Sequence, residues 1–469
     1  MDEENYEIKK SISLAENNDN KTNNYNSRNI KMNGNEIEEK LEIIIEDKNK
    51  ESQMKEIEYI NDRKKCSPIL IINNGFDFKY DRPLNLIFPV GLKNLGNSCF
   101  LNSCLQCFYH CPEFTSELLE SYQKYEKIKG TVLLAYLETL KNLYTNGKEF
   151  HERKAIRLNG VEDEYEFDYG CCCRKKKIKN NNKVIYYNIG TNPASAAELY
   201  SYILGNNANL LYNGGSDPKI VAEMILSTMN KEINPNFKYV RNKEIPKSNE
   251  ILLFEHIFNY YENNKTIISS NFYWIKERIS ICNECEKETY NFQSDYILYF
   301  YPEAIINGLN LKIDNNENKY KISLDNCFEY FHISEQLDIN LFTCYSCNKR
   351  VKAKSILTYM TTLPKYLVLC ICKDKDEQNP IDYILDYNQE IDLEKYYKKQ
   401  PKNNYSTKYK FHSGCYSRSD YFHMVAFCIH FNGLIYEFND SYFKLNNPIN
   451  SPENGTREIP YLLMFKREN

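Results

Sequence analysis

The 469-residue sequence lacks three features that would assign it to a broad class of proteins. No apolar run reaches about 20 residues, the length that a membrane-spanning helix needs. Basic residues are not in excess, because 60 Lys and Arg stand against 64 Asp and Glu, and the net charge of −4 argues against a nucleic-acid-binding protein. The first ten residues, MDEENYEIKK, lack the basic and apolar regions of a secretory signal. We therefore predict a cytoplasmic or nuclear protein that binds neither membrane nor nucleic acid, and no feature implies an oligomer.

Cysteine, by contrast, is abundant, with 17 residues in the chain. Without a secretory signal these residues are not expected to form a disulfide framework, so we interpret them as metal ligands, nucleophiles or small core residues. A chain of this length can bury an ordinary hydrophobic core without covalent cross-links. The cysteines therefore indicate metal binding, nucleophilic catalysis or core packing rather than disulfide cross-links.

The composition divides the chain into a polar N-terminal part and a folded part. Residues 1–65 are rich in Asn, Glu and Lys and are predicted to be a disordered tail. Residues 66–88 form a lead-in, and 89–469 form one folded domain. Within that domain, residues 160–188 contain acidic, cysteine and basic runs, which we interpret as a solvated insertion.

Hydrophobic periodicity predicts helices first and strands second. Apolar residues at helical spacing predict a helix from Phe100 that ends at Pro112, a second helix over 130–145, and a third that ends at Gly205. From Phe272 onward, segments such as YILYFY and YLVLCIC alternate or run apolar and are typical of strands. This order predicts an α+β fold.

Two CxxC pairs have the spacing of zinc knuckles. Cys282 and Cys285 form the first pair, and Cys344 and Cys347 form the second, each between strand-like segments. Two pairs of thiolates satisfy the tetrahedral preference of Zn²⁺ and leave no open position. We therefore predict one structural Zn²⁺ per chain, although the long segment 286–343 exceeds the spacing of a compact zinc ribbon.

The remaining cysteine pairs give a weaker signal. Cys104 and Cys107 also form a CxxC pair, but they lie on the predicted helix among apolar neighbours and are assigned to the core. Cys370, Cys372 and the run at 171–173 show how easily such pairs arise in a cysteine-rich chain. A redox role for any CxxC pair remains an alternative.

Cys99 is the candidate nucleophile because it lies where a Gly- and Asn-rich loop meets a predicted helix. The unpaired N–H groups and the positive dipole end of a helix N-terminus stabilise a thiolate and can also hold an oxyanion. Gly91 and Gly96 permit a turn that brings the side chain of Asn94 back toward the same place.

A thiolate nucleophile needs a base and a group that orients the base. His423 lies on a predicted strand, and the next strand carries Asn439 and Asp440, so two antiparallel strands would place them side by side. These residues alone leave His412 and His430 as competing bases. The chain has seven histidines in all: His110, His151, His256, His332, His412, His423 and His430.

The segments GLKNLGNSCFLNSCLQCF, FHMVAF and YEFND resemble the Cys box and His box of the ubiquitin-specific proteases, which are papain-like deubiquitinases. The resemblance implies that Cys99 is the nucleophile and that Asn94 donates to the oxyanion. It implies His423 as general base and Asn439 as the residue that orients it, with Asp440 beside them. A HSG motif often precedes this His box, which argues against His412 as the base.

The resemblance extends over residues 89–467 and implies a fold shaped like a right hand. A helical thumb over about 89–230 would carry the nucleophile, and a β-rich palm and zinc-tipped fingers would occupy about 231–469. The implied activity is thiol-dependent hydrolysis of peptide and isopeptide bonds after the C-terminal glycine of ubiquitin. The implied partners are ubiquitin and ubiquitinated proteins.

Two departures from the family pattern bear on that function. The QQDAxEF box should fall near 193–199, where the chain reads PASAAEL, so Glu198 is kept but the acidic residue that helps hold the basic ubiquitin tail becomes Ser195. The Gly and Tyr that usually flank the catalytic His become Phe422 and Met424. Three alternatives therefore remain: a weak or inactive ubiquitin-binding scaffold, a protease for another ubiquitin-like modifier, and a zinc-stabilised interaction module. Linkage preference, substrates and regulators are not indicated.

Overall fold

The computed structural model describes residues 89–126, 131–158, 193–206, 217–240, 245–314, 318–333, 341–372, 383–387, 389–399, 405–418, 423–430, 433–446 and 458–468. The predicted tail, the lead-in and the insertion at 160–188 lie outside these ranges, so the domain boundaries proposed above remain predictions. Among the described residues, no helix is both long and apolar enough to cross a membrane.

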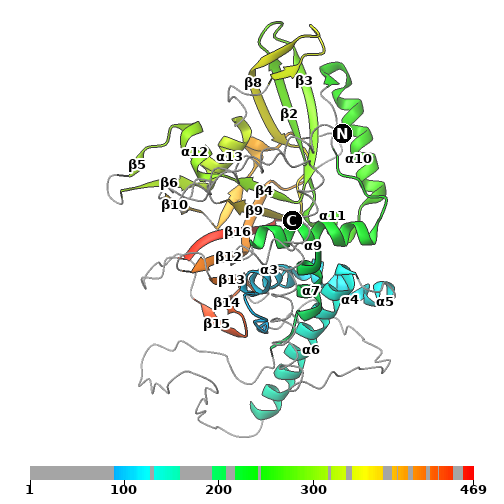
Figure 1. Cartoon of the computed structure of the whole chain (residues 1–469), viewed down its shortest axis with the longest axis vertical. Coiled ribbons are helices and arrows are strands. Elements are labelled where there is room, and N and C mark those ends of the chain that lie inside the picture. The colour runs from blue at the N-terminus through cyan, green and yellow to red at the C-terminus, as the bar shows by residue number, and fades with distance from the viewer. Residues whose placement is uncertain are drawn as a thin grey trace, which may run out of the picture. The chain divides into compact units, whose positions relative to one another are not determined.

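Helices make up the first half of the described chain (Figure 1). They are α3 (Cys99–Tyr109), α4 (Pro112–Glu120), α5 (Tyr122–Tyr125), α6 (Val132–Leu158), α7 (Ala197–Asn206) and α9 (Pro218–Ile233). The helix predicted from Phe100 begins one residue earlier and ends before Pro112. The helix predicted over 130–145 continues to Leu158 as α6.

Helix α3 lies at the centre of the fold. All of its residues are buried, which is typical of a helix that is packed on every side. It packs against α9 on the helical side and against strands β12 (Lys408–Arg418) and β13 (His423–Ile429) of the main sheet. The sequence CFLNSCLQCFY allows this because its polar residues are small or amide side chains that bond within the protein. Cys99 is therefore held at the end of a fixed element.

The main sheet forms the palm. Its strand order is β15-β14-β13-β12-β16-β9-β4, and β11 also pairs with β12. Besides β12 and β13, its strands are β4 (Ile297–Phe300), β9 (Tyr366–Ile371), β11 (Glu390–Asp392), β14 (Ile435–Asn439), β15 (Tyr442–Asn446) and β16 (Glu458–Arg467). Only β4 and β9 pair in parallel among these strands, and every residue of β9 is buried. The predicted strand segments YILYFY and YLVLCIC thus become neighbours in one sheet.

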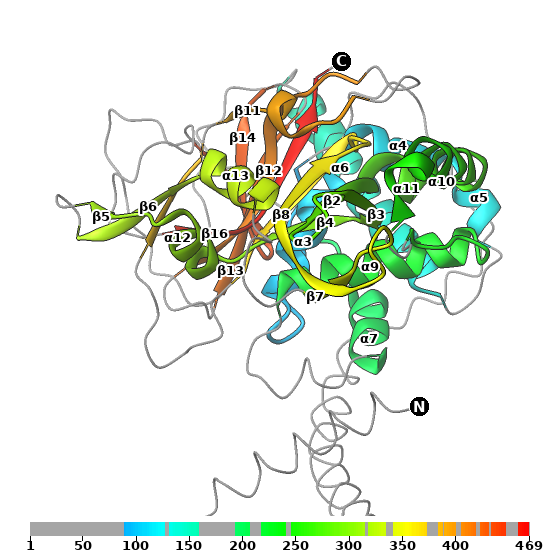
Figure 2. The same cartoon turned by 90° about the horizontal axis from the view of Figure 1, so that it is seen from above.

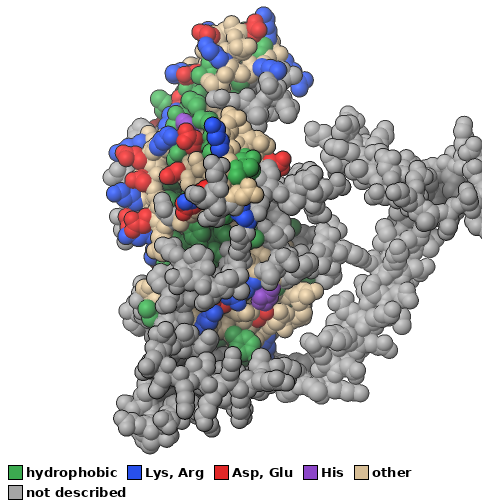
Figure 3. All heavy atoms as spheres, turned by 90° about the vertical axis from the view of Figure 1, so that its left-hand side faces the viewer, with side chains coloured by type: hydrophobic (Ala, Val, Ile, Leu, Met, Phe, Trp, Pro, Cys, Tyr) green, Lys and Arg blue, Asp and Glu red, His purple; other side chains and the backbone are tan. Residues whose placement is uncertain are grey.

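A second sheet forms the fingers, with the order β1-β3-β2-β8-β7. Its strands are β1 (Ile245–Pro246), β2 (Trp274–Cys282), β3 (Glu288–Asp295), β7 (Leu341–Thr343) and β8 (Arg350–Met360). The strands are antiparallel, and the two CxxC turns lie at their far ends. Figure 3 shows Lys, Arg, Asp and Glu side chains interspersed over this end of the molecule. Charges of both signs are therefore mixed on this face of the fingers.

Four further helices of the described chain follow α9. The first two precede β2, which agrees with the predicted order of helices before strands, and the last two lie among the strands, which that order did not predict. They are α10 (Glu250–Asn264), α11 (Ile267–Phe272), α12 (Pro302–Leu309) and α13 (Leu324–Ile333), with the short turns η1 (Lys247–Asn249) and η3 (Glu394–Tyr396). A small sheet joins β5 (Ile313–Asp314), β6 (Lys319–Ser323) and β10 (Tyr383–Asp386). Figure 2 shows α10 and α13 beside the finger strands, where α13 packs on β8. The predicted α+β class is confirmed.

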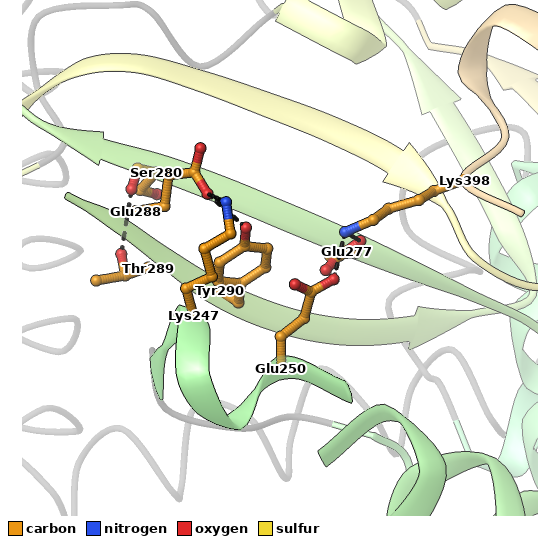
Figure 4. Close-up of polar contacts among 8 residues, drawn as sticks. All are labelled: Lys247, Glu250, Glu277, Ser280, Glu288, Thr289, Tyr290 and Lys398. Carbon is orange, nitrogen blue, oxygen red and sulfur yellow. Dashed lines mark hydrogen bonds and ion pairs between the residues drawn. The ribbon is translucent and has the colours of Figure 1, made fainter. Parts of the chain in front are cut away.

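A buried ionic network fastens α10 to the fingers (Figure 4). Glu277 of β2 is fully buried, and its carboxylate lies 2.8 Å from Nζ of Lys398, which also bonds to Glu250 of α10. Burial raises the pKa of Glu277 to about 7, although Lys398 opposes this shift. Beside this group, Lys247 and Glu288 form an exposed ion pair of 2.7 Å. Of these ion pairs, only those of Lys398 with Glu277 and Glu250 therefore link a buried charge to α10.

Candidate active site and metal centre

Cys99 is the first residue of α3 and has 8% of its surface exposed. Ser98 is the N-cap, and helix geometry leaves the N–H groups of the first turn without partners inside the helix. The loop before it contains two positive φ angles, +92° at Gly96 and +50° at Asn97. The thiol therefore lies at a helix N-terminus that follows a tightly turned loop.

His423 faces both the thiol and an orienting amide. It lies at the start of β13, and its Nε2–H donates to Oδ1 of Asn439 on β14 at 2.8 Å. The other ring nitrogen, Nδ1, is then the one left for Cys99. The hydrogen bond with Cys99 raises the pKa of His423, burial opposes that shift, and the bond to Asn439 adds to it. The structure thus brings together the three residues that the sequence analysis named as nucleophile, base and orienting group.

Asp440 joins the loop of the nucleophile to the strand of the base. Its two carboxylate oxygens accept from Nδ2 of Asn94 at 2.8 Å and from Nδ2 of Asn102 at 2.7 Å. Its backbone carbonyl accepts from the N–H of Leu92 at 2.8 Å. Asp440 itself has a φ of +50°, in the left-handed region. One side chain therefore fixes two amides that flank the thiol.

Asn94 is exposed and keeps a donor for substrate. An amide NH₂ group carries two hydrogens, and the bond to Asp440 uses one of them. Its Oδ1 accepts from the N–H of Gly96 at 2.9 Å, which fixes the direction of the amide. Asn102 is a site residue that the sequence analysis missed. The available signal was an amide side chain one turn after Cys99 on a helix that is otherwise mostly apolar.

At Gly91, the segment before Cys99 lies directly against the backbone of Asp440 and Ser441. A Cβ atom at this position would lie 2.3 Å from the carbonyl oxygen of Ser441, which follows Asp440. No side chain fits there without moving the backbone. Glycine is therefore needed at position 91 for this close approach, in addition to any role in a turn.

The competing histidines lie elsewhere. Nε2–H of His412 donates to the carbonyl oxygen of His110, which caps the opposite end of α3 from Cys99. The ring of His430 lies 6.0 Å from that of His110. Burial lowers the pKa of His110 to about 3 and that of His412 to about 4. These residues form part of the core behind the helix, and only His423 lies beside the thiol among the three candidate bases.

The four predicted zinc ligands gather at the finger ends. The sulfur atoms of Cys282, Cys285, Cys344 and Cys347 all lie within 4.8 Å of one another. Two of the separations, Cys282 to Cys347 and Cys285 to Cys344, are 3.9 and 3.5 Å. A tetrahedron with metal–sulfur bonds of about 2.3 Å has edges of about 3.8 Å, so the donor set fits a single Zn²⁺.

The two knuckles have the same backbone conformation. The residue after each second cysteine, Glu286 or Asn348, has a positive φ of 57° or 53°. Its N–H donates to the carbonyl of the first cysteine of its own knuckle, at 3.0 and 2.8 Å. Such matched turns hold each pair of sulfurs on one side of the chain. The hairpin context predicted for both CxxC pairs is therefore present.

The other cysteines of the described chain lie in the core. Cys104 and Cys107 are fully buried on α3, and Sγ of Cys107 lies 3.6 Å from Sγ of Cys415 on β12. Cys370 and Cys372 are also buried, with sulfurs 3.8 Å apart. The predicted core assignment of Cys104 and Cys107 agrees with these positions, while 171–173 lies outside the described residues.

The segment 193–199, where the acidic box was predicted, lies against the Cys box. Ala194 exchanges backbone hydrogen bonds with Gly91 and Lys93, and Glu198 is exposed on α7. Helix α9 also packs on α3, and its N-cap is Asp217. Of the residues that replace the usual neighbours of the catalytic His, Met424 is buried on β13 and Phe422 lies outside the described residues.

Comparison with known proteins identifies the family of the chain that carries this site. The family model described as ubiquitin carboxyl-terminal hydrolase matches residues 90–465, which is most of the chain. The chain belongs to this family. The matched range of the hydrolase family contains all the candidate site residues and the four clustered cysteines.

Individual relatives match short segments of this hydrolase-family chain. Ubiquitin carboxyl-terminal hydrolase 5 of Arabidopsis thaliana is 41% identical over 64 residues, which is 12% of this chain and 7% of the relative. A rice protein named inactive ubiquitin-specific protease 5 is 50% identical over 42 residues, 9% of this chain and 10% of its own. The chain thus spans about a tenth or less of these two relatives.

A solved structure supports the fold over a much longer range. The structure of the SAGA Ubp8/Sgf11/Sus1/Sgf73 DUB module bound to ubiquitin aldehyde matches with a TM-score of 0.54 and 18% identity. The match covers 83% of this chain and 72% of the other. The predicted ubiquitin-specific protease fold, with thumb, palm and fingers, is confirmed.

Proposed function

We propose that this protein is a cysteine-type deubiquitinase that hydrolyses peptide and isopeptide bonds after the C-terminal glycine of ubiquitin. The observation that carries the proposal is the alignment of Cys99, His423 and Asn439 at the N-terminus of α3, in a chain of the ubiquitin carboxyl-terminal hydrolase family. Cytoplasmic or nuclear location and the absence of nucleic-acid and membrane partners remain part of the same proposal.

In the proposed mechanism, the sulfur of Cys99 attacks the carbonyl carbon of the terminal glycine. His423 takes the thiol proton and then gives it to the leaving amine, while Asn439 keeps the imidazole in the required orientation. The oxyanion accepts hydrogen bonds from the first-turn N–H groups of α3 and from the second amide hydrogen of Asn94. Water then hydrolyses the thioester with His423 as the base.

Asp440 is proposed as a positioning residue in this scheme. Because its carboxylate holds the amides of Asn94 and Asn102, it sets the distance between the oxyanion donors and the thiol. It also follows Asn439 directly in the chain. A shift of the strand that carries the orienting residue would therefore move the oxyanion donors with it.

Asp217 is proposed as the acidic residue that pairs with the basic tail of ubiquitin. Ser195 lacks the required charge, but Asp217 begins the helix that packs on α3 and bonds to Tyr461 on β16, so it lies where the thumb faces the palm. An acidic group at that junction supplies a charge-assisted partner for an arginine of the tail.

Zn²⁺ is proposed as the ion held by the four finger cysteines. Its role would be structural, because four thiolates complete its coordination and leave no position for substrate. The folding free energy that such an ion supplies would order the finger ends. The reaction residues lie on other elements, so no step of the proposed reaction passes through the metal.

The experiment that tests the function uses electrophilic probes. Wild-type protein is incubated with ubiquitin and with related modifiers that each carry a C-terminal electrophile, and Cys99→Ala is the control. We expect a covalent adduct with the ubiquitin probe at Cys99, and loss of both the adduct and the hydrolysis of a ubiquitin–fluorophore conjugate in the variant.

The same experiment separates the alternatives. Stoichiometric binding of ubiquitin without an adduct would contradict the enzyme and favour a scaffold. An adduct only with another modifier would replace ubiquitin as the substrate. Absence of any binding would favour a zinc-stabilised interaction module.

A further inference from the structure

Tyr200 of α7 contacts the chain on both sides of the nucleophile. Its hydroxyl donates to the carbonyl oxygen of Gly96, three residues before Cys99, at 2.8 Å. Its ring lies against that of Phe100, the residue after Cys99, with centroids 6.5 Å apart. One side chain from a different helix therefore touches both ends of the segment that carries the thiol.

The loop before Cys99 needs such support because its backbone is strained. Asn97 is a non-glycine residue with a φ of +50°, which costs free energy relative to the ordinary regions. Within the loop, the N–H of Leu95 donates to Oγ of Ser98 at 2.8 Å, and the N–H of Gly96 donates to Oδ1 of Asn94. These bonds hold N–H groups, whereas the carbonyl of Gly96 is held from outside the loop.

The start of α7 is firmly attached to the same region. The N–H of Ala194 donates to the carbonyl of Gly91 at 3.0 Å, and the N–H of Lys93 donates to the carbonyl of Ala194 at 2.9 Å. Leu199 of α7, next to Tyr200, is fully buried. The hydroxyl of Tyr200 thus extends from a fixed support to the middle of a strained loop.

We propose that Tyr200 is a positioning residue for the thiol reaction. By holding the carbonyl of Gly96, it fixes the plane of the peptide group that leads into Asn97, and so the direction of the N–H groups that follow. Those N–H groups include that of Cys99, which would meet the oxyanion. This inference rests on the proposed function and adds a residue that acts through the loop without touching the substrate.

The test compares two tyrosines that make the same kind of bond. Tyr200→Phe removes only the hydroxyl and keeps the ring against Phe100. Tyr260→Phe is the matched control, because the hydroxyl of Tyr260 on α10 also donates to a backbone carbonyl, that of Asn236, at 2.8 Å. With a ubiquitin–fluorophore conjugate, we expect Tyr200→Phe to lower kcat about two- to tenfold, the effect of one net hydrogen bond, with KM unchanged. Tyr260→Phe should keep wild-type kcat and KM.

A transition-state analogue gives a second readout. Ubiquitin aldehyde forms an adduct whose oxygen occupies the oxyanion position, so its affinity should fall by the same factor in Tyr200→Phe. The affinity of unmodified ubiquitin should stay the same. If Tyr200 acted in folding alone, the ratio of the affinities for ubiquitin aldehyde and unmodified ubiquitin would be the same in the variant as in wild type. An equal loss of affinity for both ligands would therefore overturn the proposal. Wild-type kcat in Tyr200→Phe, or an equal loss in the two tyrosine variants, would also overturn it.

Hydrogen–deuterium exchange separates this inference from the proposed function. Amides of the peptide 91–99 should exchange faster in Tyr200→Phe than in wild type and in Tyr260→Phe, and this measurement needs no substrate. If the wild-type protein hydrolyses nothing and forms no adduct with ubiquitin aldehyde, the proposed function is wrong. If exchange of 91–99 is the same in all three proteins, Tyr200 does not hold the loop and the inference is wrong by itself.

Discussion

At the residue scale, the arrangement around Cys99 depends on backbone conformation as much as on side-chain type. Asn97 and Asp440 both adopt positive φ, and Gly91 is the residue that lets the two segments approach each other. Such positions store strain that the surrounding contacts must maintain. Residue types alone named Cys99 and left three histidines as candidate bases, and the family resemblance selected His423; the bonds between the segments that hold these residues depend on geometry.

The role proposed for Asp217 gives a residue-scale prediction. Asp217→Asn should raise KM for a ubiquitin substrate about five- to 150-fold with little change in kcat, because a charge-assisted bond contributes about 1–3 kcal/mol equally to the ground and transition states. Asparagine is as good an N-cap as aspartate, so the start of α9 should be preserved. Steady-state kinetics with increasing substrate provide the measurement.

One control variant and two contrary outcomes make this prediction specific. Glu198→Gln removes an acidic group from the exposed face of α7 and should leave KM unchanged. An unchanged KM in Asp217→Asn would show that the tail is held by other groups. A fall in kcat with constant KM would instead place Asp217 among the residues that act on the transition state.

At the element scale, the matched knuckles of the fingers give a prediction about metal. Cys347→Ser should abolish the binding of the single Zn²⁺ and lower the melting temperature, because the ion supplies folding free energy. Elemental analysis of protein purified without chelator and thermal unfolding provide the two measurements. Cys327→Ser, which changes a buried cysteine outside the cluster, should keep one zinc per chain. Native protein without zinc would contradict the assignment.

Sequence patterns predicted some elements better than others. The helix at Cys99 and the strands around His423 were predictable because their periodicity and turn residues agree with their tertiary environment. Helix α10 was not identified although it precedes the predicted strand region, and α12 and α13 were missed among the strands because they are short amphipathic stretches between apolar segments. The acidic box was predicted near 193–199 on the match of Glu198, and that placement remains a prediction; the packing of α9 on α3, which makes Asp217 a second candidate, could be found only from the tertiary structure.

At the scale of the whole molecule, two buried groups make stability depend on pH in opposite directions. His412 has a folded pKa of about 4, below its usual value of 6.5, so it binds a proton on unfolding and stability is lost as the pH falls below 6.5. Glu277 has a folded pKa of about 7, above the usual 4.5, so it contributes stability at low pH that is lost as the pH rises toward 7. The two contributions partly cancel between pH 6.5 and 5.

Variants should separate these contributions. His412→Gln should reduce the rise of the unfolding free energy with pH by about 1.4 kcal/mol per pH unit over this window, and Glu277→Gln should increase it by about the same amount. Urea unfolding at several pH values between 6.5 and 5 measures the slopes. His256→Gln changes an exposed residue of α10 and should give the wild-type slope. Slopes that are the same in all variants would show that neither buried group is linked to folding.

Strand β16 has a consequence for the order of events during synthesis. It lies inside the palm sheet, between β12 and β9, and the bond from Asn94 to Asp440 joins residues 346 positions apart. A growing chain on the ribosome therefore carries the thiol of Cys99 long before its base and oxyanion frame can assemble. The sheet closes only after Arg467 has left the exit tunnel. Translation itself thus delays the meeting of Cys99, His423 and Asp440 until the strands that hold them together have been made.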